Sequence, residues 1–350
     1  VLKMKKTLII SLLLVLTFSF VFAQGQQEVK KTADSGLSGN VVIYYAGTPD
    51  EQEVFERLWY KQNPNCTLEF INAGTGELQA RIEAEAANPQ GDILFGGSYS
   101  IYASMLDYLQ PYVSPVYKED CLPSFCGESD YYTPIQINVN TIIVNNKMVS
   151  DLGIKVDSWD SLLNPAIKGS ISYVDPSASS SAREQVINML CAKAAEAGDT
   201  MDDHWDFVTE YFKNLDGKMH SSSSKVPQAV ANGEYAVGIT NEELVLQLML
   251  DGVDVSPVYA KEGITLRNSF TGIIKDCKNP ENAKAFIDFA LSYEVQQALA
   301  DECLMRSVRR DVVFSGLDGV PASGDLPALN YPVEWVAANP KLKAALQTII

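Results

Sequence analysis

Strand-like and helix-like segments alternate along the chain, and this alternation restricts the fold more than any other feature of the sequence. Residues 41–45, 67–71 and 92–95 each form a short apolar run, and an amphipathic helical pattern follows each of them. Strands that alternate with helices form a parallel sheet covered by helices on both faces. The sequence therefore predicts an α/β fold.

The same alternation returns after a break, with strands predicted at residues 169–174 and 235–239. Two extended, strand-rich stretches, near 135–144 and 255–274, connect the two blocks. We expect two lobes, each with a doubly wound sheet, joined by these stretches as a two-strand hinge. One larger sheet domain with an insertion is the alternative, and the sequence shows no internal repeat.

The predicted lobes divide the chain unevenly. The first lobe is expected to consist of residues 40–137 and 257–350, and the second lobe of residues 138–256. A length of 350 residues is sufficient for two domains that each bury a core.

The first 23 residues are typical of an export signal. A basic start precedes an almost unbroken apolar run over residues 8–22, and Ala23 is a small residue at the expected cut. The run is short for a membrane span, which needs roughly 20 residues, so a cleaved signal peptide is favoured over a membrane anchor. We expect export to the periplasm, with a flexible leader over residues 24–39.

The charge of the chain excludes several classes of partner. With 27 Lys and Arg against 44 Asp and Glu, the net charge is −17. Such a field repels nucleic acid and anionic lipid, and no basic stretch offsets it. A small anionic ligand remains compatible, because local dipoles can hold it. We expect a monomer without a stable membrane anchor.

Six cysteines leave the redox chemistry open. Export permits disulfides, and six cysteines allow 15 complete pairings. A bridge between Cys121 and Cys126 across a short loop is favoured, and free buried thiols are the alternative for the rest. The chain has two histidines and no Cys-x-x-Cys, so we expect no metal site and no cofactor. The other four cysteines are Cys66, Cys191, Cys277 and Cys303.

The strand-to-helix turns are the candidate binding site, because ligands of open α/β sheets bind at the carboxyl ends of strands. These turns are small and rich in Gly, Ser and Thr, and the free amides at a positive helix end suit a phosphate or carboxylate. The candidate ligand-binding residues are Thr48, Thr75, Gly76, Glu77, Gly97, Ser98, Ser179, Ser180, Ser181, Ser222, Ser223, Thr240 and Glu242.

Helix capping explains each of these turns taken singly. Ser181-x-x-Glu184 and Thr240-x-x-Glu243 have the form of capping boxes. The serine runs 179–181 and 221–224 are longer than caps require, so we expect them to face each other across a cleft.

Charged residues near the turns have two interpretations. Glu77, Glu242 and Glu243 could accept hydrogen bonds from sugar hydroxyls or complement helix dipoles. The basic residues near the turns are expected to be solvated surface charges, and they are Arg81, Arg183 and Lys225. No nucleophile elbow, Walker loop or dinucleotide fingerprint occurs, so we expect no enzymatic activity.

Several of these segments resemble the periplasmic binding proteins of ABC importers, in the branch named for ferric-iron binding. Residues 74–78, 88–97 and 175–181 carry the resemblance, together with 214–218 and 232–238. Residues 279–284 fit solute-binding proteins more broadly, and the resemblance spans about residues 40–313. It implies a type 2 fold that closes on a ligand and delivers it to a membrane permease.

The resemblance also bears on the ligand. Iron-binding members have a tyrosine pair after the strand that here ends at Ile239, where this chain has residues 240–243, Thr-Asn-Glu-Glu. Their histidine in the first turn has no match in residues 46–48. The serine-rich turns resemble the hexose-phosphate-binding members, which implies a phosphorylated sugar or another organophosphate. A ferric-iron receptor is the alternative, and a secreted hydrolase is a third possibility that lacks a nucleophile.

Overall fold

The computed structural model describes residues 36–349, apart from residues 178, 315 and 340–341. The expected signal peptide at 1–23 and most of the expected leader lie outside the described residues. In the described part of the chain, no helix is both long and apolar enough to cross a bilayer.

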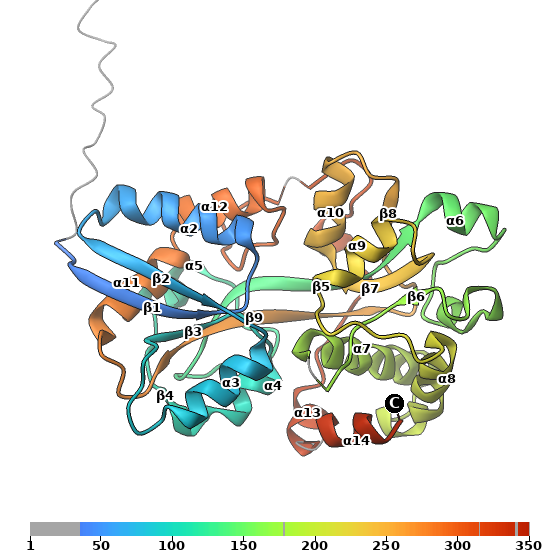
Figure 1. Ribbon diagram of the computed structural model, residues 1–350, viewed down its shortest axis with the longest axis horizontal. Helices are drawn as coiled ribbons and strands as arrows, with labels where there is room; N and C mark the ends of the chain where they lie inside the picture. Colours follow the sequence, from blue (N-terminus) through green and yellow to red (C-terminus); the bar gives the residue numbers. More distant parts are fainter. Residues whose placement is uncertain (1–35, 178, 315, 340–341, 350) are drawn as a thin grey trace, which may run out of the picture.

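The elements alternate as the sequence predicts (Figure 1). The strands are β1 Gly39–Tyr45, β2 Cys66–Asn72, β3 Ile93–Phe95, β4 Leu109–Gln110, β5 Thr133–Asn145, β6 Ile171–Ser172, β7 Val237–Asn241, β8 Val255–Val258, β9 Ile264–Ile274 and β10 Ala328–Leu329. The helices are α2 Pro49–Gln62, α3 Thr75–Ala84, α4 Tyr99–Ser104, α5 Pro115–Asp120, α6 Asn146–Asp151, α7 Ser180–Ala197, α8 Trp205–Leu215, α9 Lys225–Ala231, α10 Glu242–Leu250, α11 Pro280–Ala290, α12 Tyr293–Glu302, α13 Val333–Ala338 and α14 Leu342–Ile349.

The strands form two sheet halves that share their central strands, in the order β2-β1-β3-β9-β5-β7-β6. Within the first half, β1 pairs in parallel with β2 and β3. Within the second half, β6 pairs in parallel with β7. The α/β class is confirmed, and the two halves are continuous because β5 pairs with β9 of the first half and with β7 of the second.

The pair β5/β9 is the connection between the lobes, and it runs across the middle of the molecule (Figure 1). The two strands are antiparallel, with Thr133 opposite Thr271 and Val139 opposite Leu266. The predicted extended stretch 135–144 lies within β5. The predicted stretch 255–274 is instead two strands, β8 and β9, separated by a turn.

Helices cover both faces of each half (Figure 1). In the first half, α2 and α11 pack on the sheet through an aromatic cluster, in which Phe286 contacts Phe55 and Trp59. The helices α3 and α4 lie on the opposite face. In the second half, α9 and α10 cover one face and α7 and α8 the other. Because helices cover both faces of each half, a ligand has access to the sheet at the turns beyond the carboxyl ends of the strands.

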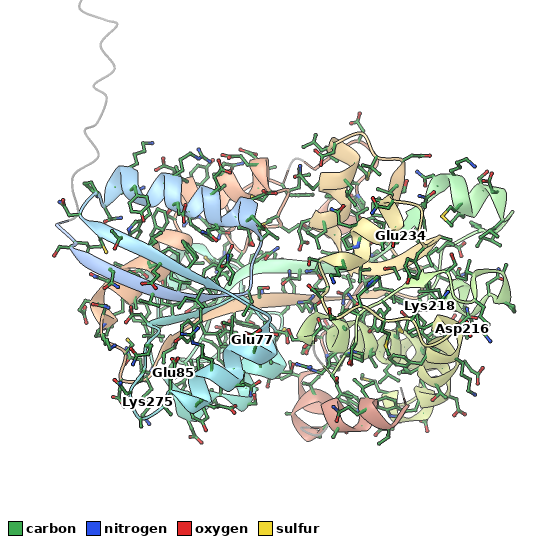
Figure 2. The ribbon with its side chains drawn as sticks, viewed as in Figure 1. Glu77, Glu85, Asp216, Lys218, Glu234 and Lys275 are labelled. Carbon is green, nitrogen blue, oxygen red and sulfur yellow. The ribbon has the colours of Figure 1, made fainter. Side chains whose placement is uncertain are left out.

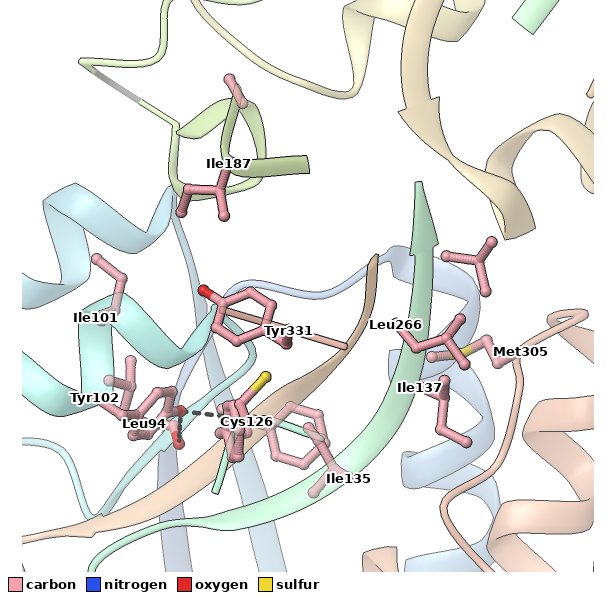
Figure 3. Packing of buried hydrophobic residues seen from close by; sticks show 14 of the residues in the cluster. Leu94, Ile101, Tyr102, Cys126, Ile135, Ile137, Ile187, Leu266, Met305 and Tyr331 are labelled. Atoms are coloured by element: carbon pink, nitrogen blue, oxygen red, sulfur yellow. Dashed lines mark hydrogen bonds between the residues drawn. The ribbon is translucent and has the colours of Figure 1, made fainter. Parts of the chain in front are cut away.

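The C-terminal segment crosses to the second half of the molecule. Its strand β10 pairs with β9 beside Ile264, and Trp335 of α13 donates a hydrogen bond to Asp202 at 3.0 Å. Tyr331 lies in the buried cluster that also contains Ile187 of α7 and Ile101 of α4 (Figure 3). The end of the chain therefore contacts both lobes, whereas the sequence placed all of residues 257–350 in the first lobe. The expected lobe boundaries stay a prediction.

All six cysteines are free thiols, and five of them are buried. The expected bridge between Cys121 and Cys126 is not formed. Cys126 instead packs within the core near Ile135 (Figure 3). Burial raises the pKa of both thiols to about 12, so they are protonated at neutral pH.

Candidate functional site

A cleft of about 760 Å³ opens at the β5/β9 crossover, between the turns of the two lobes. It collects most of the turn residues that the sequence predicted. These are Thr75, Gly76, Glu77, Gly97, Ser98, Ser179, Ser180, Ser181, Ser222 and Ser223. Glu77 lies at the end of α3 that faces the second lobe (Figure 2).

The serine run before α7 does more than cap the helix. Ser179 is the N-cap, and its hydroxyl accepts from the amide of Ala182 at 3.4 Å. Ser180 is buried, and its hydroxyl oxygen accepts from Thr75 Oγ1 at 2.9 Å. Thr75 belongs to the first lobe and Ser180 to the second, so the two lobes touch directly across the cleft.

The turn after β3 lies close to the turn after β1. Gly96 has a φ of 87°, and a Cβ added there would lie 2.9 Å from the carbonyl oxygen of Ala46. Only glycine allows this approach without strain. The contact brings Gly97 and Ser98 alongside the first turn, at the first-lobe wall of the cleft.

Among the described lining residues of this cleft, Arg267 of β9 is the one cation, and the sequence pattern did not predict it. The residue is 3% exposed, and its guanidinium donates to Asn241 Oδ1 at 2.9 Å. Its Nε has no hydrogen-bond partner in the structure. A buried charged donor without a partner is costly, and because the Nε itself is buried, a ligand reaches it only if the side chains around it move.

A second compartment of about 350 Å³ adjoins the first. Gly47, Ser223 and Ser269 line both, so the two form one continuous cleft. Thr48 lies here as the N-cap of α2, in the predicted capping box with Glu51. Two carboxylates from opposite lobes, Glu51 and Glu243, also line this compartment.

These two carboxylates are held in a poorly solvated place. Burial raises the pKa of Glu51, whose Oε2 accepts from the Thr48 amide at 2.6 Å and the Tyr45 hydroxyl at 3.1 Å. Burial also raises the pKa of Glu243 to about 7, and the nearby charge of Glu51 adds to the effect. The second compartment is thus acidic, whereas the first contains the cation Arg267.

A match to a family model over most of the sequence identifies the family of this chain. Residues 52–302 match the model of the bacterial extracellular solute-binding proteins, which covers most of the chain. The chain belongs to this family. It is also 23% identical over 254 residues to a putative 2-aminoethylphosphonate-binding periplasmic protein of Salmonella typhi, covering 71% of this chain and 72% of the relative.

Solved structures of periplasmic binding proteins share the fold. AfuA of Actinobacillus pleuropneumoniae, solved with exogenous fructose 6-phosphate bound, has a TM-score of 0.79 at 24% identity, over 89% of this chain and 98% of AfuA. Iron-bound HitA of Pseudomonas aeruginosa has a TM-score of 0.70 at 17% identity, over 88% of this chain and 99% of HitA. The two-lobed type 2 fold of the solute-binding proteins is confirmed.

Two predicted site residues of this solute-binding protein lie outside the lining of both compartments. Glu242 is 2% exposed and forms a bidentate ion pair with Arg306, at 2.6 and 2.9 Å, while Tyr259 donates to the same carboxylate. Thr240 is a buried residue of β7. The structure therefore does not bring these two together with the serine turns.

The position at which α10 begins explains why Thr240 and Glu242 lie outside the cleft lining. The helix begins at Glu242 with Asn241 as N-cap, one residue later than the predicted capping box at Thr240 requires. The predicted box at Ser181 is displaced in the opposite direction, because Ser179, two residues earlier, caps α7. Since successive helical residues point about 100° apart, Glu243 lines the cleft and Glu242 does not.

The basic residues near the turns have different roles from one another. Arg81 and Lys225 are at the surface, as predicted, and Arg81 pairs with Glu85 at 2.9 Å. Arg183 is 7% exposed and donates to the carbonyl of Pro176, so the prediction of a solvated charge is wrong there. The motif at 214–218 lies away from the cleft, with Asp216 and Lys218 on the outer side of the second lobe (Figure 2).

Glu242→Gln is expected to destabilise the protein rather than to change its ligand. The substitution leaves Arg306 as an unpaired buried charge, which costs about 3–5 kcal/mol. Urea denaturation measures this, with the exposed Glu53→Gln as the control that removes the same charge from the surface. The double variant Glu242→Leu/Arg306→Met should recover most of the loss. An unfolding free energy that is unchanged in Glu242→Gln would contradict the ion pair.

Proposed function

We propose that this solute-binding protein captures an organophosphate, in the first place a phosphorylated sugar, and delivers it to the permease of an ABC importer. The observation that carries the proposal is the cleft lined by the buried cation Arg267 and by serine hydroxyls from both lobes. We further propose that the protein acts in the periplasm as a monomer, after removal of its signal peptide near Ala23.

The donors of the first compartment suit a phosphate group. A phosphate carries up to two negative charges and three terminal oxygens, so it takes several donors at once. Arg267 supplies a charged N–H, and Thr75, Ser180 and Ser223 supply hydroxyls beside the starts of α3, α7 and α9. Hydrogen bonds to a charged group are worth about 1.5–3 kcal/mol each. A few such bonds are sufficient for capture from dilute solution.

The relatives support the same chemical class. AfuA was solved with fructose 6-phosphate, and the Salmonella relative is named for a phosphonate. Phosphates and phosphonates share the tetrahedral anionic group that the serine turns and Arg267 suit. The carboxylates of the second compartment suit the other end of such a ligand, since they accept hydrogen bonds.

The iron alternative has less support from the cleft. Fe³⁺ prefers phenolates and other hard anionic oxygens. Among the described lining residues of the first compartment, Tyr45 is the one tyrosine. Its hydroxyl donates to Glu51, and burial raises its pKa well above the ordinary value. A phenolate is therefore costly to form here.

The hydrolase alternative has little support from the described cleft lining, whose one thiol, Cys303, has its pKa raised by burial to about 12. Ser172 Oγ lies 3.0 Å from His220 Nε2, but Ser172 is fully buried and belongs to neither compartment. Among the described residues of the cleft, Ser180 and Ser222 hydrogen-bond to other hydroxyls, and no histidine is in the lining. We therefore propose a transport role without catalysis.

Arg267→Gln is expected to weaken fructose 6-phosphate binding roughly 100-fold, because a charged hydrogen bond of about 3 kcal/mol is lost. Ser180→Ala should weaken fructose 6-phosphate binding roughly tenfold, because the loss of one hydroxyl hydrogen bond to the phosphate costs about 1.5 kcal/mol. Isothermal titration calorimetry measures both, and Arg81→Gln is the control that removes an exposed, paired arginine.

Arg267→Lys separates folding from recognition. It keeps the charge in β9 but loses the planar fork, so it should fold and bind with intermediate affinity. If Arg267→Gln folds and binds like the wild type, the phosphate site lies elsewhere.

Ferric citrate should leave the visible spectrum of the purified protein flat at one equivalent. The physical reason is the absence of a phenolate pair from the described cleft lining, since iron–phenolate coordination gives a charge-transfer band. Absorption spectroscopy makes the measurement, with an iron-binding family member as the positive control. A stoichiometric band would favour the ferric-iron receptor instead.

A further inference from the structure

A groove of about 630 Å³ lies beside the cleft, between the first lobe and the C-terminal segment. Helices α3 and α4 form one wall of this groove, and α13 and the start of α14 form the other (Figure 1). Gly76 lines both the groove and the first compartment, so the groove adjoins the cleft. Small-molecule sites often lie between domains in this way.

The walls of the groove are mainly apolar, and its rim is polar. Gln79 and Glu83 lie at the rim, and Gln79 Nε2 donates to Glu83 Oε1 at 2.9 Å. Leu106 is 41% exposed, so the groove leaves apolar surface in contact with water that a hydrocarbon group can cover. The apolar lining from both walls includes Tyr99, Ile101, Ala103, Leu106, Val336 and Leu342.

A buried cation lies within this apolar lining. Arg183 of α7 is 7% exposed, and it is the one cation among the described residues that line the groove. Its Nη1 donates to the carbonyl of Pro176 at 2.9 Å, whereas its Nε and Nη2 make no hydrogen bond to a described residue. Burial lowers the pKa of Arg183, and the nearby charges of Glu184 and Asp175 only partly oppose this shift.

The two acidic neighbours of this guanidinium are held by other donors. Glu184 is 1% exposed, and its carboxylate accepts from the hydroxyls of Ser100 at 3.3 Å and Tyr331 at 2.7 Å. Asp175 Oδ1 accepts from the amide of Ser177 at 2.7 Å. Because no carboxylate of the described residues pairs with the guanidinium, its charge is left for an anion in the groove.

The free edge of Arg183 favours a carboxylate over other anions. Nε and Nη2 are parallel donors on one edge of a planar group, and the two oxygens of a carboxylate match such a pair. An apolar tail on the same molecule would cover the walls of the groove. A phosphorylated sugar suits the groove less, because its hydroxyls would lose hydrogen bonds to water against apolar walls.

We propose that the groove is a second ligand site, separate from the cleft, and that it takes an amphipathic organic carboxylate. The carboxylate lies against Nε and Nη2 of Arg183, and the tail lies between Tyr99 of α4 and Val336 of α13. Because these two side chains belong to opposite walls, the ligand contacts the first lobe and the C-terminal segment at once. This inference does not depend on which solute the cleft binds.

Ligands that differ in charge or in chain length test the site on the wild-type protein. Isothermal titration calorimetry at pH 7 should show octanoate binding at one equivalent. The alcohol 1-octanol has the same chain without the charge, and it should bind roughly tenfold more weakly or less, because charge-assisted hydrogen bonds are lost. Acetate should bind at least roughly 100-fold more weakly, because each methylene group that octanoate buries adds to affinity. Equal affinities for octanoate and 1-octanol would overturn the carboxylate site.

Variants of two arginines locate the binding. Arg183→Met keeps a long apolar side chain without the charge, and it should weaken octanoate binding at least roughly tenfold. Arg81→Met, the same change at an exposed arginine of α3, should leave octanoate binding intact. Melting temperatures show whether the variants are folded, and if Arg183→Met is not, Arg183→Lys should bind octanoate with intermediate affinity, because it keeps the charge but loses the planar fork.

Two outcomes with these variants contradict the proposal. An affinity for octanoate that stays at the wild-type value in folded Arg183→Met, or in Arg183→Lys if only that variant folds, would show that Arg183 does not hold the carboxylate. An equal loss of octanoate binding in Arg267→Gln and Arg183→Met would place the anion in the cleft instead of the groove.

Discussion

The antiparallel pairing of β5 with β9 is the constraint on which the rest of the molecule depends. This pairing joins the two halves of the sheet, since β5 also pairs with β7, so its hydrogen bonds fix how the turns of one lobe face those of the other. A parallel strand ending in each lobe places a helix start at the cleft, and the crossover makes those starts converge. The pair also supplies ligand-facing side chains itself, because Asn138, Arg267 and Ser269 lie on it.

Some buried charged side chains form ion pairs that hold the fold together, whereas others have no oppositely charged partner and can interact with a ligand. Arg306 and Glu242 satisfy each other and connect the segment after α12 to α10 of the second lobe. Arg309 is likewise paired with Asp311 at 2.7 Å. Arg267, by contrast, keeps an unpartnered Nε, and no Lys, Arg or His is among the described residues that line the compartment of Glu51 and Glu243. Since burying a charge without compensation is costly, the unsatisfied groups are the ones that a ligand can complete.

The sequence predicts the local features of this cleft because they follow local rules. The capping box at Thr48 and Glu51 has a fixed spacing, and the serine runs at 179–181 and 221–224 stand at helix starts that periodicity identifies. The contribution of Arg267 could not be predicted in this way, because it lies inside the strand Ile264–Ile274 and its position beside the cleft depends on the crossover. Glu242 and Glu243 show a second limit. A shift of one residue at the helix start exchanges which carboxylate faces the cleft and which pairs with Arg306.

A crystal structure of the protein with fructose 6-phosphate tests the central claim most directly. The account predicts the phosphate within hydrogen-bond distance of Arg267 Nε and of hydroxyls from both lobes, including Ser180 or Thr75. It also predicts that the carbon end of the ligand extends toward Glu243. A phosphate bound outside this cleft, with Arg267 Nε still unpartnered, would contradict it.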